Sequence, residues 1–165
     1  MRTLKVSVGI VGSVALLVTG LVVTRPQVAL AQGDPHVGTW VLNVAKSKYT
    51  PGPPPKEQTS VYSASGQGIK VTTKGTSADG KPTATDYTAN FDGKDYPVTG
   101  NPDWDALSVK RVDSHTIEFT RKKAGKTVQT ATSVVSKDGK TRTVTTAGVN
   151  AQGQKINTVG VYEKK

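Results

Sequence analysis

The sequence predicts an all-β protein, an antiparallel meander β-barrel of eight to ten strands preceded by an N-terminal signal helix. Runs rich in valine, threonine and tyrosine recur along the chain, as expected of half-buried strands. Short turns of glycine, aspartate and asparagine separate them, and nothing after residue 31 has a plausible helical pattern. Such strands pair with their sequence neighbours. We predict a barrel, because an open sheet would leave long exposed edges.

The first 31 residues have the pattern of a secretory signal. Arg2 and Lys5 precede an uncharged apolar run over residues 6–23, and Ala29-Leu30-Ala31 forms a small-residue cleavage site. We therefore expect residues 1–31 to be a cleaved signal peptide and residues 32–165 to be one barrel domain that is periplasmic or extracellular. A retained membrane anchor is the alternative, because 18 apolar residues lie at the lower limit of a bilayer span.

Composition limits what the exported domain can be. The chain has no cysteine, so strand ladders and a core must stabilise it without disulfides. The net charge is +10, and +7 remains after residue 31. The basic residues are scattered over strands and turns, which favours a solvated surface over nucleic-acid binding. We expect no nucleic-acid partner, no stable membrane span after cleavage, and a monomer.

The expected strands follow from the turns. The first, residues 37–45, opens with Gly38-Thr39-Trp40, and Trp40 is its largest apolar anchor. Four prolines within residues 51–55 then predict an extended loop across one end of the barrel. The other strands are expected at residues 59–64, 69–75, 83–91, 95–98, 107–112, 116–122, 127–135, 141–149 and 156–163.

Alternation along these strands separates an inner from an outer face. The opposite face of the same strands is largely charged or polar, so the more apolar face is predicted to point inward. Large apolar side chains number 29 of the 134 residues after residue 31, a sparse filling for such a barrel. Either the barrel is flattened and tightly packed, or it is hollow. The residues predicted to face inward are Ile69, Val71, Thr73, Tyr87, Ala89, Phe91, Leu107, Val109, Arg111, Ile117, Phe119, Arg121, Val128, Thr130, Thr132 and Val134.

The Gly38-x-Trp40 motif, the meander and the terminal Val161-Tyr162-Glu163-Lys164 resemble the lipocalin and fatty-acid-binding-protein (calycin) superfamily. The pattern is also similar to small exported bacterial lipocalin-like proteins of unassigned activity. The resemblance implies that Gly38 and Trp40 form a structural anchor at the closed end of the barrel. Two features depart from it. Gly160 stands where fatty-acid-binding proteins carry the arginine of an Arg-x-Tyr carboxylate anchor, and the proline-rich loop replaces their helix pair.

Two arginines are the main candidates for ligand contact. If Ser114 centres a hairpin turn, Arg111 pairs with Ile117 and Val109 with Phe119, so that both Arg111 and Arg121 face inward. An inward guanidinium could hold a carboxylate or phosphate; alternatively, both arginines lie at the rims and reach water. We expect the cavity to be lined by Tyr87, Phe91, Val109, Arg111, Phe119 and Arg121.

Catalytic and metal-binding signatures are missing from the sequence. His36 and His115 lie in the lead segment and in a turn, and neither has a partner suited to a general base. The loop at residues 101–105 has too few oxygen ligands for calcium and is better explained as a lid or turn with Trp104 against the rim. We expect no enzyme, no cofactor and no metal.

These observations predict an exported binding protein for a small hydrophobic or amphiphilic, possibly anionic, ligand held in the barrel cavity. The alternative is a structural or interaction protein of the cell envelope, with a filled barrel and no ligand.

Overall fold

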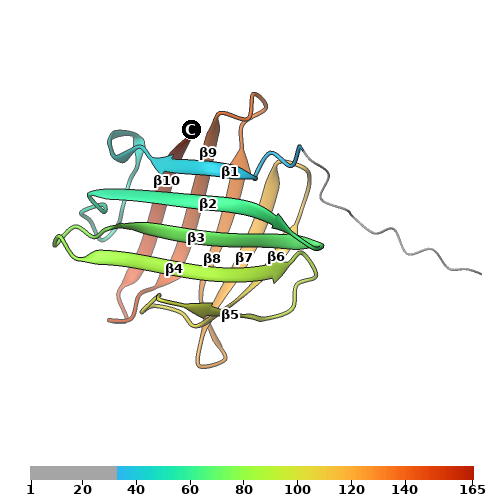
Figure 1. Cartoon of the computed structure of the whole chain (residues 1–165). Helices are drawn as coiled ribbons and strands as arrows, with labels where there is room; N and C mark the ends of the chain where they lie inside the picture. The colour runs from blue at the N-terminus through green and yellow to red at the C-terminus, as the bar shows by residue number, and fades with distance from the viewer. Residues whose placement is uncertain (1–32) are drawn as a thin grey trace, which may run out of the picture.

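The computed structural model describes residues 33–165, which form a closed barrel of ten antiparallel strands (Figure 1). The expected signal helix and its cleavage site lie outside the described residues. Each strand pairs with its sequence neighbours, and β1 pairs with β10 to close the barrel, so the predicted fold is confirmed. The strands are β1 (Gly38–Leu42), β2 (Glu57–Ser65), β3 (Gly68–Thr76), β4 (Pro82–Asn90), β5 (Tyr96–Thr99), β6 (Ala106–Arg111), β7 (Thr116–Lys123), β8 (Lys126–Val135), β9 (Thr141–Val149) and β10 (Lys155–Lys164).

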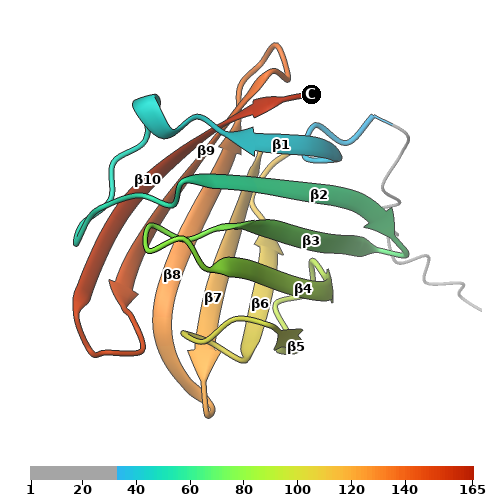
Figure 2. The same cartoon turned by 60° about the vertical axis from the view of Figure 1, so that its left-hand side comes forward.

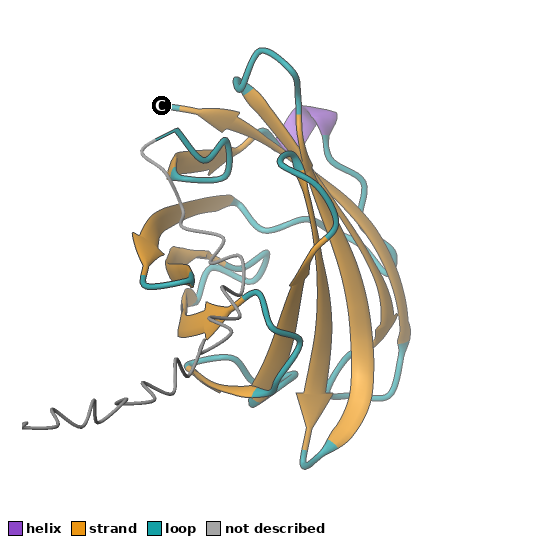
Figure 3. Cartoon of the chain, turned by 90° about the vertical axis from the view of Figure 1, so that its right-hand side faces the viewer, coloured by secondary structure: helices purple, strands orange, loops and turns teal. Residues whose placement is uncertain are grey.

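The two ends of the barrel differ in the loops that they carry. Figure 2 shows β1 to β4 crossing in front of the long strands β7 to β10, and Figure 3 shows the wall curving around one interior. One end carries the β1–β2 loop, the β5–β6 loop and the β9–β10 turn, and we call it the mouth. The lead segment at residues 33–37 and the β6–β7 turn lie at the other end, the closed end.

Side chains within the turns explain why the hairpins are so short. In the β8–β9 turn the Asp138 carboxylate accepts hydrogen bonds from the Ser136 hydroxyl at 2.6 Å and from the Lys140 N–H at 3.0 Å. Gly139 follows with φ +70°, a conformation that glycine adopts without steric cost. The chain therefore reverses within a few residues, and β8 pairs directly with β9.

The first strand is shorter than predicted. It ends at Leu42, and a short 3-10 helix, η1 (Val44–Lys46), takes the place of its last residues. The Asn43 side chain accepts a hydrogen bond from the Lys46 N–H at 3.1 Å, and this local bond competes with continued pairing. The proline-rich stretch after η1 is a loop, as predicted. Among residues 33–165, no helix is long and apolar enough to cross a membrane.

The hairpin between β6 and β7 has the predicted register. Val109 lies opposite Phe119, and Arg111 lies opposite Ile117. Directly opposite residues share a face of the sheet, so these four side chains point inward. Val109 and Ile117 are fully buried, and Phe119 nearly so.

The inward face of β8 was predicted wrongly by one residue. A register shift between Arg121 and Lys122 marks an irregularity in the β7–β8 pairing, beyond which Phe119 lies opposite Ala131. Ala131 therefore points inward with Phe119, whereas Val134 is 44% exposed. The buried residues of β8 are Gln129, Ala131, Ser133 and Val135, not Val128, Thr130, Thr132 and Val134.

Candidate functional site

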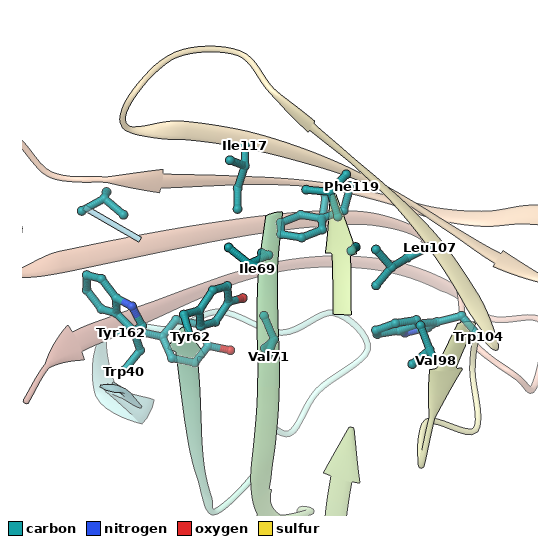
Figure 4. Close-up of a cluster of buried hydrophobic side chains, with 14 of the residues drawn as sticks. Trp40, Tyr62, Ile69, Val71, Val98, Trp104, Leu107, Ile117, Phe119 and Tyr162 are labelled. Atoms are coloured by element: carbon teal, nitrogen blue, oxygen red, sulfur yellow. The ribbon is translucent and has the colours of Figure 1, made fainter. Parts of the chain in front are cut away.

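A cavity of about 380 Å³ lies inside the barrel between the mouth and the closed end. Its wall is mixed, with aromatic rings, hydroxyl groups, amides and two guanidiniums. Figure 4 shows Tyr62 and Tyr162 beside Trp40 toward one end of the buried cluster, and Trp104 beside Leu107 toward the other. Of these five residues, all but Trp40 line the cavity. The barrel is therefore hollow in its mouth half and packed toward its closed end.

Arg142 is the most deeply buried charge in this wall. It lies at the start of β9, opposite Val135 of β8 and Tyr162 of β10, and its side chain is 2% exposed. The guanidinium carbon lies 4.2 Å from the centre of the Tyr62 ring and 4.8 Å from that of Tyr162, in cation–π contact. Within residues 33–165, its Nε and Nη1 atoms make no hydrogen bond. Arg142 thus carries buried donors that the described part of the protein does not satisfy.

Arg121 is the second cation of the cavity, nearer the mouth. It lies toward the end of β7, and its Nη1 donates to the Gln129 Oε1 at 3.0 Å. The guanidinium carbon lies 4.8 Å from the centre of the Trp104 ring. Burial lowers the pKa of Arg121, and nearby tyrosines and Asp103 oppose that change. Because the pKa of arginine is so high in water, the side chain remains charged.

Among residues 33–165, a single carboxylate belongs to the cavity lining with these two arginines. It belongs to Asp103 of the β5–β6 loop, and its Oδ1 already accepts a hydrogen bond from the Ala151 N–H at 2.8 Å. The charged residues of the described lining are thus Asp103, Arg121 and Arg142, which leaves an excess of one positive charge. A cavity of this composition attracts an anion.

Four tyrosines contribute hydroxyl groups to the lining. Burial raises the pKa of Tyr87, reinforced by its neighbour Tyr62, and burial raises the pKa of Tyr162 and of Tyr49 as well. All three therefore stay neutral near pH 7, when a phenol can donate a hydrogen bond. The Tyr162 hydroxyl donates to the Gln58 Oε1 at 3.2 Å. The cavity thus combines apolar ring surface with neutral polar donors.

The six predicted ligand-contact residues fall in three places. Tyr87, Phe119 and Arg121 line the cavity together. Val109 is fully buried in the core, and Phe91 and Arg111 lie at the closed end, outside the cavity lining. The Arg111 guanidinium carbon lies 4.1 Å from the centre of the Phe91 ring, and Arg111 forms an ion pair with Asp34. The structure therefore brings three of the six residues to the cavity.

The closed end is held by the lead segment. The Asp34 carboxylate binds Arg111 and also accepts the His36 N–H at 2.9 Å. Burial lowers the pKa of His36 to about 4, opposed by Asp34, so His36 is neutral near pH 7. The Trp40 indole N–H donates to the His36 carbonyl at 2.8 Å. Gly38 lies close to the Lys164 side chain, where an added Cβ would come within 2.6 Å of Cε. Gly38 and Trp40 thus lie where the lead segment meets the barrel.

Arg142 and Gln129 are cavity residues that the sequence prediction missed. The hairpin turn centred on Asp138 and Gly139 places Arg142 opposite Val135. Had β8 been assigned its true register, with Val135 inward, the same pairing would have placed Arg142 inward as well. The wrong face of β8 placed Gln129 outward, and Arg142 was missed because no face was predicted for β9.

No protein-family model matches the sequence, and no curated protein matches it. Among solved structures, the chain is similar to zebrafish ileal bile acid-binding protein complexed with cholic acid, with a TM-score of 0.48 and 13% sequence identity. That alignment covers 79% of this chain and 99% of the zebrafish chain. The fold itself rests on the strand pairing of the described residues, which form a closed ten-stranded antiparallel meander.

Proposed function

We propose that this protein is an exported binding protein for a small amphiphilic molecule that carries an anionic group, held in the barrel cavity. Arg142 is the observation that carries the proposal. Its Nε and Nη1 atoms are buried without an acceptor among residues 33–165, which lowers stability because the desolvation of these donors is not compensated. A carboxylate or phosphate in the cavity would supply both the missing acceptors and the missing negative charge.

The geometry around Arg142 limits how an anion can approach. Tyr62 and Tyr162 lie within cation–π distance of the guanidinium, which leaves its N–H edge as the route for an acceptor. An edge-on approach suits a planar or bidentate oxyanion. The aromatic rings of the same wall, with Phe119 and Trp104, offer apolar surface to the rest of the ligand.

The alternative of a filled envelope barrel without a ligand is less well supported. It requires a packed interior, whereas the cavity occupies about 380 Å³ and includes a positive charge that the described lining leaves unbalanced. The proposal includes no catalysis. Export rests on the signal-like pattern of residues 1–31, and a monomer is consistent with a barrel in which every described strand has two neighbours.

Calorimetry with a matched pair of probes tests the proposal. Octanoate and octanamide have the same chain, and only the first is an anion. Replacing Arg142 by Gln is expected to weaken octanoate binding about 10- to 100-fold, the loss of one charge-assisted hydrogen bond, and to leave octanamide unchanged. Lys110→Gln on the outer face of β6 is the control and should change neither.

The stability of the same variant separates a binding role from a structural one. If Arg142 is kept for a ligand, removing its uncompensated charge leaves the free energy of unfolding of the empty protein unchanged or higher. A clear loss of stability, with octanoate binding intact, would instead make Arg142 a packing residue. Arg121→Leu extends the test to the mouth, where we expect a loss of octanoate binding in a folded protein. An unchanged affinity would remove Arg121 from the site.

A further inference from the structure

A second hollow, of about 550 Å³, adjoins the cavity at the mouth, and we call it the outer compartment. It lies among the proline-rich loop, the β3–β4 turn and the β5–β6 loop. The two hollows share five lining residues, so they meet rather than lie apart. The shared residues are Gln58, Thr73, Thr85, Asn101 and Asp103.

The outer compartment differs chemically from the cavity. Four prolines from three separate segments line it, and a proline ring presents apolar, conformationally fixed surface without a backbone N–H. Both buried guanidiniums belong to the cavity alone. The charged groups of the outer lining are Lys81, which pairs with Asp79 at 2.9 Å, and the already bonded Asp103. The prolines are Pro53, Pro55, Pro82 and Pro102.

One side of the mouth is closed by a contact between two of its loops, and this limits the direction in which a ligand can leave the cavity. The hydrogen bond from the Ala151 N–H to Asp103 ties the β9–β10 turn to the β5–β6 loop. Asn150 and Ile156, at the two ends of the β9–β10 turn, line the cavity but not the outer compartment. The outer compartment opens instead beside the β3–β4 turn, on the other side of the β5–β6 loop.

We infer that the two hollows form one binding site for an anion longer than the cavity itself. Its charged end lies with Arg142 and Arg121, and its apolar end leaves the barrel between the proline-rich loop and the β5–β6 loop, against the four prolines. This arrangement rests on the proposed function, and it adds the length of the ligand and the place of its distal part. The inference follows from the chemistry of the two hollows. The two guanidiniums lie in the cavity, whereas the outer compartment offers apolar proline surface and, among the described residues, no unpaired charge.

Blocking the outer compartment alone tests this assignment. Thr83 of β4 lines the outer compartment but not the cavity, and it has the same strand parity as the cavity residues Thr85 and Tyr87. Thr83→Trp therefore introduces a large ring at the mouth on the side of the prolines. Thr88→Trp places the same ring on the same strand but on the opposite, exposed face, and it is the matched control.

Hexanoate and tetradecanoate, measured by calorimetry below their micellar concentrations, are the short and long probes. In the unaltered protein we expect tetradecanoate to bind at least tenfold more tightly, since each buried methylene is worth up to about fourfold in affinity. In Thr83→Trp, tetradecanoate should weaken at least tenfold while hexanoate stays within about twofold. Thr88→Trp should alter neither probe.

Each other outcome is informative. Unchanged tetradecanoate binding in Thr83→Trp, or an equal loss for both probes, would overturn the two-compartment site. If Thr83→Trp does not fold, the carboxylate series in the unaltered protein decides: affinity that stops rising beyond hexanoate overturns the inference, and a continued rise supports it. If no carboxylate of any length binds the unaltered protein, the proposed function itself fails.

Discussion

Replacing Asp34 by Ala should destabilise the barrel strongly, although Asp34 lies in the lead segment before the first strand. The Asp34 side chain is 3% exposed, and that of its partner Arg111 is 17% exposed. Removing the carboxylate leaves the Arg111 guanidinium with the Phe91 ring and with one long bond to the Ser114 carbonyl at 3.4 Å. It also removes the acceptor of the His36 N–H. An unpaired, largely buried cation would remain at the closed end.

The expected magnitude follows from the burial of the pair. Removing one partner of a buried ion pair typically costs about 3–5 kcal/mol, and the partial exposure of Arg111 favours the lower end, about 3 kcal/mol. With a urea m-value of about 1–3 kcal/mol per molar, the unfolding midpoint should fall by roughly 1–3 M, with the slope unchanged. Asp34→Asn should lose less than Asp34→Ala, because the amide oxygen can still accept hydrogen bonds.

Urea unfolding followed by tryptophan fluorescence measures the effect, and a second aspartate provides the control. Asp79 also pairs with a cation, Lys81, but the two side chains are 58% and 80% exposed. Asp79→Ala should therefore leave the midpoint unchanged. If Asp34→Ala stayed within about 1 kcal/mol of the unaltered protein, the lead segment would not be a structural part of the barrel and the reasoning would be refuted.

Two further predictions concern acid stability and strand spacing. Burial lowers the pKa of His36 from 6.5 to about 4, so the unfolded chain binds this proton first and the free energy of unfolding should fall by up to about 3 kcal/mol between pH 6.5 and 4. His36→Leu should flatten the urea-derived profile in that window, and parallel profiles would contradict the assignment. Gly68→Ala would bring a Cβ within 1.9 Å of the Ala89 carbonyl oxygen and should cost about 1–3 kcal/mol or more. Gly66→Ala meets no atom within 4 Å, and although its φ of +56° adds some strain, it should unfold at a higher urea concentration than Gly68→Ala.

The hairpin of β6 and β7 illustrates what the sequence could predict. The residues of its turn are easily recognised in the sequence, and its inward side chains are buried in the core. Alternation along the two strands therefore assigned Val109, Ile117 and Phe119 correctly to the inner face. The sequence could not reveal that Asp34 binds Arg111, because the two are 77 residues apart. That ion pair makes Arg111 part of the closed end instead of the cavity wall.

β8 illustrates the opposite case. Val134 is exposed and Val128 only half-buried, whereas Gln129 and Ser133 are buried, so apolar character does not mark the inner face of this strand. Counting apolar residues therefore assigned the wrong face to β8. No face was predicted for β9, so Arg142, which lies opposite the buried Val135, was not considered as an inward residue.

The position of this error is itself informative about function. Hydrophobicity marks the inner face wherever the interior is packed, as it does for Trp40, Ile69 and Ile117. It stops marking that face where polar side chains point into a hollow, and β8 and β9 contribute Gln129 and Arg142 to the cavity. A domain that only needed to be stable would gain from apolar residues at these two positions. Local sequence rules commonly fail at functional sites. The rule fails on β8, which contributes Gln129 to the cavity wall, so the failure occurs at the ligand site that we propose.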